Sequence, residues 1–164
     1  TNSSVPVTVS GVVGATSVTA YTTTCATISG AVKCWGNGAY GTIGDGGSSD
    51  RWVPTQATGL TSGWVEVSAS WYSVCARNRQ GTVKCWGNGN TAGELLVGSI
   101  TTSSTPTSII GAGSGYAQLS SGEAYHCMKT FDGYLKCGGL NSSGQLGDGH
   151  NGNVSSSAVI ILFP

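Results

Sequence analysis

The stretch Cys75–Gly89 reads CARNRQGTVKCWGNG, and the chain contains two further versions of it. Cys25–Gly38 reads CATISGAVKCWGNG, and Cys127–Asn141 reads CMKTFDGYLKCGGLN. The first cysteines of the three versions stand 50 and then 52 residues apart. A period near this length is typical of repeat arrays in which each repeat is one supersecondary unit.

Each version predicts a β-hairpin whose two cysteines face each other. Pairing Cys25 with Cys34 leaves Ser29 and Gly30 as a two-residue turn. The other two versions are one residue longer, and their three-residue loops end in glycine, as a hairpin with a left-handed bulge position requires. Counting outward from each turn puts the cysteines at non-hydrogen-bonded sites, where facing Cβ atoms come closest.

We therefore predict three disulfides, each within one hairpin: Cys25–Cys34, Cys75–Cys85 and Cys127–Cys137. The alternatives are reduced thiols or a zinc site. Zinc sites usually use cysteines two to four residues apart, whereas these pairs are nine or ten apart. We expect no metal and no cofactor. Disulfides require an oxidising compartment, so the predicted location is extracellular or the cell surface.

Other motifs recur with the same period. GTIGDG at Gly41–Gly46 matches GQLGDG at Gly144–Gly149, and VPTQATGL at Val53–Leu60 matches TPTSIIG at Thr105–Gly111. The first eleven residues resemble the latter pair, which predicts that the chain begins within a repeat. The expected boundaries of this single array are 1–11 for the closing strand of a preceding unit, then 12–60, 61–111 and 112–164 for the three repeats.

The combined pattern resembles the regulator of chromosome condensation repeat, and most closely its cysteine-containing bacterial or extracellular variety. The resemblance implies an all-β fold: β-propeller-type repeats, with three four-stranded antiparallel blades plus an extra N-terminal closing strand. Two departures stand out. The second repeat has AGELLVGS at Ala92–Ser99 in place of the Gly-Asp-Gly turn, and Gly138 stands in the third repeat where Trp35 and Trp86 stand in the others.

Composition excludes several classes of function. Charged residues make up only 9% of the chain and the formal net charge is zero, so the basic excess needed to bind nucleic acid is absent. No stretch reaches the roughly 18 apolar residues of a membrane helix, and we expect no membrane insertion.

Candidate catalytic groups are few, and we predict that the protein is not an enzyme. His126 stands beside Cys127 and is interpreted as a packing residue, and His150 stands in a polar loop. Asp45 and Asp148 occupy equivalent turns in different repeats, where an aspartate caps backbone amides.

Non-repeating aromatic residues are the strongest indication of a binding site, because aromatic side chains anchor protein and sugar recognition. The alternative for these residues is packing between blades. The candidate binding residues are Tyr40, Trp52, Trp64, Trp71, Tyr72 and Tyr125. Asn2, Asn141 and Asn153 stand in N-x-S/T sequons and are candidate glycosylation sites, although a chain rich in Ser and Thr contains such sequons by chance.

Two functions fit this sequence. The first is a structural protein whose repeats assemble with copies of themselves, as a homo-oligomer, or with neighbouring repeats of a longer chain, into a surface structure or filament. The alternative is a secreted recognition module that binds a protein or a carbohydrate through its blade loops. Aromatic residues clustered on one face would favour recognition, and aromatic residues spread through subunit contacts would favour assembly.

Overall fold

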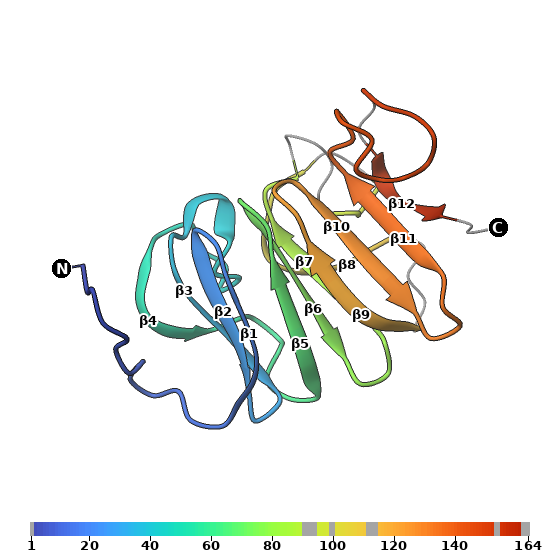
Figure 1. Ribbon diagram of the computed structural model, residues 1–164. Coiled ribbons are helices and arrows are strands. Elements are labelled where there is room, and N and C mark those ends of the chain that lie inside the picture. Colours follow the sequence, from blue (N-terminus) through green and yellow to red (C-terminus); the bar gives the residue numbers. More distant parts are fainter. Residues whose placement is uncertain (1, 90–94, 99–100, 111–114, 153–154, 162–164) are drawn as a thin grey trace.

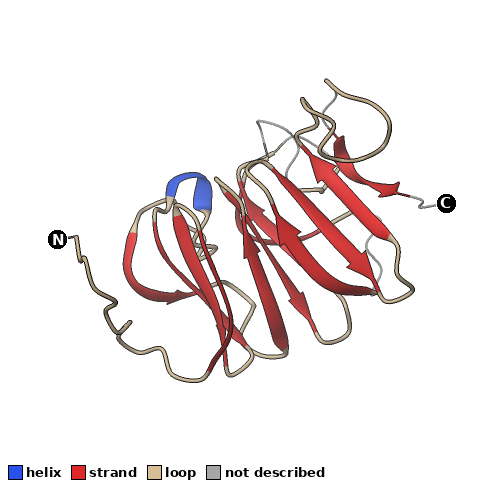
Figure 2. Cartoon of the chain, viewed as in Figure 1, coloured by secondary structure: helices blue, strands red, loops and turns tan. Residues whose placement is uncertain are grey.

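The chain folds into three four-stranded antiparallel sheets placed side by side, as Figures 1 and 2 show. The computed structural model describes residues 2–89, 95–98, 101–110, 115–152 and 155–161. Each sheet lies within one predicted repeat, and we number the sheets as blades 1 to 3. Blade 1 contains β1 (Ala15–Ala20), β2 (Thr23–Ile28), β3 (Ala31–Gly36) and β4 (Arg51–Gln56). Blade 2 contains β5 (Trp64–Ala69), β6 (Ser73–Asn78), β7 (Val83–Gly87) and β8 (Ser103–Ser108). Blade 3 contains β9 (Tyr116–Ser121), β10 (Tyr125–Thr130), β11 (Leu135–Gly139) and β12 (Ser155–Ile161).

Helix is almost absent from this fold. Among the described residues the one helical element is a 3-10 turn, η1 (Ala39–Gly41), in the loop between β3 and β4. In the part of the chain that the structure describes, no helix is long and apolar enough to cross a membrane.

The central hairpin of each blade has the predicted register. Cys25 faces Cys34 across β2 and β3, and Ser29 and Gly30 form the turn with φ of 50° and 83°. Positive φ at both turn residues is the type I′ geometry, whose twist matches that of the flanking strands. The longer hairpins of blades 2 and 3 place Gly81 and Gly133 at φ of 81° and 94°. These glycines supply the left-handed position that the three-residue loops require.

Disulfides join the facing cysteines in all three hairpins, and each pair has a Cα–Cα distance of 4.1 Å. No described cysteine is left free. The bridges of blades 1 and 2 are fully buried, whereas Cys127 in blade 3 is half-buried. The sulfur atoms of the first two blades are therefore part of the packing between sheets.

The first strands of the three blades lie next to one another and hold the blades together. The backbone amides of Val67 and Ala69 in β5 donate hydrogen bonds to the hydroxyls of Ser17 and Thr19 in β1, at 3.3 and 3.0 Å. The outer edges of blades 1 and 2 are β4 and β8, which contain Pro54 and Pro106. Proline fits an edge strand because its position needs no ladder donor.

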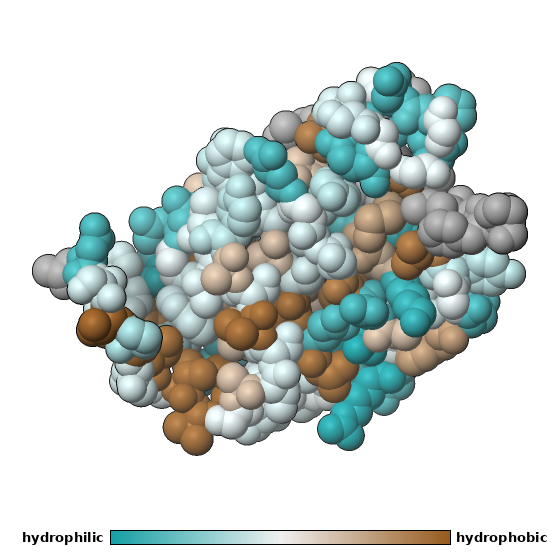
Figure 3. Space-filling model, in the orientation of Figure 1, coloured by the Kyte–Doolittle hydropathy of each residue, from teal (hydrophilic) through white to brown (hydrophobic). Residues whose placement is uncertain are grey.

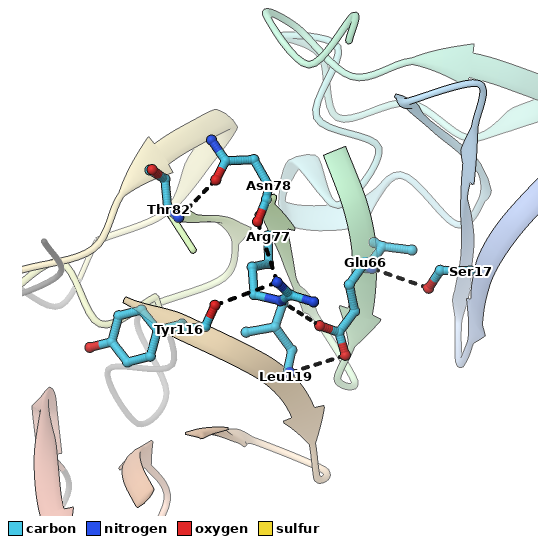
Figure 4. A network of polar contacts seen from close by, with 8 residues as sticks. Ser17, Glu66, Arg77, Asn78, Thr82, Tyr116 and Leu119 are labelled. Atoms are coloured by element: carbon cyan, nitrogen blue, oxygen red, sulfur yellow. Dashed lines mark hydrogen bonds and ion pairs between the residues drawn. The ribbon is translucent and has the colours of Figure 1, made fainter. Parts of the chain in front are cut away.

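An ion pair with backbone partners ties blade 2 to blade 3 (Figure 4). Arg77 Nε donates to Glu66 Oε2 at 2.7 Å, and the other carboxylate oxygen accepts the amide of Leu119 in β9 at 3.1 Å. The Arg77 guanidinium also reaches the Tyr116 carbonyl oxygen at 3.4 Å. Through the Glu66 carboxylate and the Arg77 guanidinium, the network joins blade 2 to the backbone of β9.

The core lies between the blades, in two apolar clusters. Between blades 1 and 2, Ile43 and Leu60 meet Val67 and Trp86. Between blades 2 and 3, Leu95 and Leu96 meet Tyr116, Leu119 and Met128. Trp86 is fully buried, and its indole N–H donates to the Thr42 carbonyl oxygen at 2.8 Å.

Steric constraints explain why the Cys-Trp-Gly motif ends in glycine. Gly36, Gly87 and Gly139 all have φ between 100° and 114°, and each lies at a register shift in its strand. A Cβ on Gly87 would overlap the carbonyl oxygen of Tyr72. Glycine therefore allows the end of the third strand to pass directly under the preceding turn.

The second repeat keeps the buried position of the Gly-Asp-Gly turn with different residues. Leu96 has a left-handed φ of 58°, and its carbonyl accepts the Ile110 amide at 2.8 Å, just as Gly44 accepts the Thr58 amide at 2.8 Å. Leu95 is buried where Ile43 and Leu146 are buried in the other blades. The remainder of the AGELLVGS stretch lies partly outside the described residues.

The third blade compensates for its missing tryptophan with a histidine. Gly138 faces His126 across β10 and β11, and the buried imidazole reaches Ser73 of blade 2 at 2.8 Å. Residues 2–14 belong to no sheet of this chain and their side chains are largely exposed, so the closing of a preceding blade by residues 1–11 stays a prediction. A strand needs a partner edge for its backbone amides, and each blade of this chain already has four strands of its own.

Candidate recognition site

The blades have two different ends. The hairpins β2–β3, β6–β7 and β10–β11 lie at one end, which we call the hairpin end, at the lower side of Figure 1. The turns β1–β2, β5–β6 and β9–β10, and the loop containing η1, lie at the opposite end, which we call the loop end.

The turns of the loop end form a continuous hydrogen-bonded row across the three blades. The Thr22 hydroxyl donates to the Trp71 carbonyl oxygen at 2.6 Å, and the Trp71 amide donates to the Glu123 carbonyl oxygen at 2.9 Å. These bonds fix the turns relative to one another, so side chains from different repeats keep a constant spacing on this surface.

Four aromatic rings gather on this row. The Trp71 and Tyr72 rings stack with centroids 5.4 Å apart, Tyr40 meets Tyr72 edge-on at 4.9 Å, and Tyr21 lies 6.4 Å from Trp71. Trp71, Tyr40 and Tyr21 are 41%, 46% and 54% exposed. We call these four residues the aromatic row; it presents large ring faces to solvent that are already held in place by their neighbours.

The backbone at Tyr40 is arranged to present its ring. Its φ of 59° is left-handed, which is rare for a bulky residue. The surrounding loop holds this conformation: the Gly38 amide donates to Asp50 Oδ1 at 2.9 Å, and the Ala39 amide donates to Asn37 Oδ1 at 2.8 Å. Strained backbone of this kind occurs preferentially at functional sites.

The other predicted binding residues do not join the aromatic row. Trp52 is 92% exposed but lies on the outer strand β4, and Tyr125 is half-buried at the start of β10. The prediction that Trp64 is a surface binding residue is wrong: it is only 7% exposed and packs between blades 1 and 2. Tyr21 was missed, although its place in the β1–β2 turn corresponds to that of Trp71 in blade 2.

His126 lies at the centre of a buried chain of hydroxyls. Its Nδ1 lies 2.6 Å from Ser121 Oγ, and Ser121 Oγ lies 2.7 Å from Ser68 Oγ. Burial lowers the pKa of His126 to about 4. The buried, neutral imidazole therefore acts as a packing residue. Its two ring nitrogens face the hydroxyls of Ser73 and Ser121, and not a carboxylate that would orient the ring as a base.

The aspartates of the two equivalent turns cap backbone amides. Asp45 accepts the Gly47 amide at 2.9 Å and pairs with Arg51; burial alone would raise its pKa, but these two partners outweigh it and the pKa lies below its usual value. Asp148 accepts the His150 amide at 3.0 Å, which lowers its pKa. Among the described residues, no group of three or more His, Cys, Asp or Glu side chains could hold a metal ion.

The three sequons have different outcomes. Asn141 is buried, and its side chain donates to Asp148 and His150 and accepts the Leu146 amide, so the prediction that it is a glycosylation site is wrong. Asn2 is exposed. Asn153 lies outside the described residues.

Comparison with known families agrees with the fold. Two models of the regulator of chromosome condensation (RCC1) repeat match residues 29–77 and 64–94. The chain belongs to the RCC1 repeat family. Residues 29–77 run from the hairpin turn of blade 1 into β6, so an RCC1 repeat and a blade are offset along the sequence.

Curated relatives match this sequence, and solved structures share its fold. The E3 ubiquitin-protein ligases HERC2 of Homo sapiens and Mus musculus are 34% identical over 140 residues, which cover 84% of this chain and 3% of each ligase. Human WBSCR16 superposes with a TM-score of 0.73 at 22% identity, covering 85% of this chain and 35% of that one. Prp20p of Saccharomyces cerevisiae superposes with a TM-score of 0.74 at 13% identity, covering 87% of this chain and 36% of that one. The chain thus spans about a third of these solved structures and a small part of the ligases.

Proposed function

We propose that this chain is a non-catalytic recognition module that binds a protein partner through the loop end of its RCC1 repeats. The aromatic row carries this proposal. Exposed tryptophan and tyrosine rings that neighbours already hold in place lose little conformational entropy on binding, and such residues dominate binding energy in protein interfaces. The sequence allowed either recognition or self-assembly. Because the aromatic residues gather at one end of the blades, the structure favours recognition.

The structural neighbours support a protein partner. Prp20p was characterised for its binding to Gsp1p and histones, and another solved structure shows Kap60 bound to yeast RCC1 (Prp20). From these neighbours we take only that the partner of this chain is a protein. The three disulfides favour function in an oxidising compartment, and we propose an extracellular or cell-surface location.

A displayed library of random peptides, selected against the full chain, tests the proposal. Selected peptides should lose at least tenfold in affinity for Trp71→Ala and keep their affinity for Trp52→Ala, which removes an exposed indole from the outer strand. A glycan panel is screened in parallel with the same two variants. Binding that depends on Trp52, no binder that depends on Trp71, or glycan binding that depends on Trp71 would each overturn a protein-recognition role for this end.

Self-assembly is a second candidate, favoured by a different surface. Val5, Val7 and Val9 alternate along the N-terminal segment, and all three are exposed, as are Val13 and Val18. Brown apolar residues gather at the lower left of Figure 3, where Figure 1 draws residues 2–14. Alternating apolar residues without a sheet partner suit addition to the edge of another sheet, which would build a homo-oligomer or filament.

Sedimentation velocity of the full chain over a range of concentrations tests assembly. Larger species should form with rising concentration and disappear when Val5, Val7 and Val9 are replaced by serine, while Val53→Ser on the outer strand leaves them intact. A monomer at every concentration would remove this candidate and leave the recognition role unaffected.

A further inference from the structure

The zero net charge of the chain conceals a separation of charge between its two ends. Six of the seven basic residues lie in or next to the hairpins of the hairpin end, where Arg79 is in a turn and the others stand on the adjoining strands. These residues are Lys33, Arg77, Arg79, Lys84, Lys129 and Lys136. Glu66 and Asp132 are the described acidic residues in that half.

The loop end has the opposite sign. Asp45, Asp50, Glu123 and Asp148 stand in its turns and loops, and Arg51 is the one described lysine or arginine there. Arg51 is already paired with Asp45 at 2.5 Å. Within the described part of the chain, neither Asp50 nor Glu123 forms an ion pair. Their charges are therefore available to a partner.

These two carboxylates belong to the segments that hold the aromatic row. Asp50 accepts the Gly38 amide two residues before Tyr40, which places one negative charge at the Tyr40 end of the row. Glu123 accepts the Trp71 amide with its carbonyl oxygen, which places its turn against Trp71. Residues with unpaired negative charge thus stand beside the Tyr40 end of the row and beside Trp71.

We propose that the loop end binds a cationic segment of the protein partner, with arginine or lysine side chains over the aromatic row and the carboxylates of Asp50 and Glu123 at its flanks. This inference rests on the proposed recognition role and specifies the chemistry of its partner. A guanidinium or ammonium group is attracted to the face of tryptophan and tyrosine rings, and carboxylates nearby add to that attraction. Arginine suits the site best because its planar group also stacks.

The spacing of the rings fits an extended segment. Alternate side chains of an extended strand stand about 6.6 Å apart, since each residue advances about 3.3 Å. The centroids of Tyr21 and Trp71 lie 6.4 Å apart, and Trp71 and Tyr72 lie 5.4 Å apart. Cationic residues at alternate positions can therefore meet the Tyr21 and Trp71 rings without compressing the peptide backbone, and the Tyr72 ring stacks against Trp71.

Fluorescence anisotropy with a labelled peptide of alternating glycine and arginine tests this inference on the full chain. Two matched peptides replace arginine by citrulline, which keeps the shape and removes the charge, or by glutamate. The arginine peptide should bind at least tenfold more tightly than the citrulline peptide, and its affinity should fall several-fold between low salt and about 0.5 M salt because screening weakens charge attraction.

Variants identify the site. Trp71→Ala should weaken the arginine peptide at least tenfold. The double variant Asp50→Asn/Glu123→Gln should weaken it about threefold to tenfold, while the side-chain oxygen that remains at position 50 still accepts the Gly38 amide. Trp52→Ala and Asp132→Asn are the controls, and neither should change the affinity. Circular dichroism confirms that each variant is folded.

The outcomes separate this inference from the proposed function. Equal binding of the arginine and citrulline peptides, or unchanged affinity in the double variant, overturns the cationic partner. If the peptide library still yields neutral sequences that depend on Trp71, the recognition role stands and only its chemistry is wrong. If neither selection nor the arginine peptide depends on Trp71, both are wrong.

Discussion

The hairpin end and the loop end of the same three blades differ in what their sequences repeat. At the hairpin end, each blade has a cystine-linked hairpin, a glycine in the turn and a lysine before the second cysteine. At the loop end, the β1–β2 turn of blade 1 has Tyr21, the β5–β6 turn of blade 2 has Trp71 and Tyr72, and the β9–β10 turn of blade 3 has Glu123.

This difference separates two tasks. The repeated end contains what every blade needs in order to fold, namely tight turns, a fixed register and a cross-strand bridge. The varied end contains what only the whole array can provide, because its aromatic row is assembled from two blades and flanked by a third. Substitutions of the hairpin cysteines should therefore change stability, and substitutions in the aromatic row should change binding.

Removing a buried bridge should have the largest effect on stability. Cys75→Ser/Cys85→Ser should lower the free energy of unfolding by about 4 kcal/mol, since it frees the hairpin in the unfolded chain and puts hydroxyls into the core between blades. Cys127→Ser/Cys137→Ser should lower it by only about 2 kcal/mol, because Cys127 is half-buried. Denaturant titration of both variants measures the difference, and equal losses would contradict the packing role of the second bridge.

Acid should weaken the contact between blades 2 and 3. Burial holds the pKa of His126 at about 4, below its ordinary value of 6.5. Between these values the unfolded chain binds a proton that the folded chain does not, so stability is complete above about pH 6.5 and falls by about 3 kcal/mol as the pH drops to about 4. In His126→Gln this part of the pH dependence should be absent. An unchanged profile of the urea midpoint against pH in that variant would show that another group is responsible.

Two glycines with the same backbone preference should differ in their tolerance of a methyl group. Gly87→Ala should cost about 3 kcal/mol, since φ is 107° and the new Cβ would overlap the Tyr72 carbonyl oxygen. Gly133→Ala also has a positive φ, of 94°, but no atom lies within 4 Å of the new Cβ, and it should cost about 1 kcal/mol. Thermal unfolding of the pair separates steric overlap from backbone preference, and equal melting temperatures would refute the overlap.

The smallest effect on stability should come from the residue that matters most for binding. Trp71→Ala should change the free energy of unfolding by less than about 1 kcal/mol, because the indole is 41% exposed and packs against two other surface rings. Denaturant titration checks this, with Trp64→Ala as the buried counterpart, which should lose about 3 kcal/mol. A large loss for Trp71→Ala would make the aromatic row a structural element.

The sequence predicted the repeated end well because its signals are local. Hairpin register follows from counting residues between two cysteines, and turn type follows from the position of glycine. The arrangement of blades followed from family resemblance. The buried position of Leu95 and Leu96 was not predicted, because a leucine in left-handed conformation has no local signal that distinguishes it from an irregular loop.

The varied end was predicted only in part because it depends on contacts between repeats. Tyr40, Trp71 and Tyr72 were identified as aromatic residues that do not recur, but nothing in one repeat indicates that Tyr21 of another lies beside them. The error at Trp64 had an available signal: Tyr116 stands at the corresponding start of β9 and is also buried, so an aromatic residue does recur there. The closing strand at 1–11 had a strand-like pattern, but no partner edge in this chain.

The most direct test of the recognition role follows the five tryptophan indole N–H signals by NMR while a selected peptide partner is added. The signal of Trp71 should shift or broaden, and those of Trp52 on the outer strand and of the buried Trp64 and Trp86 should not move. If Trp52 responds and Trp71 does not, the partner binds the outer edge of the blades and the loop end is not the recognition site.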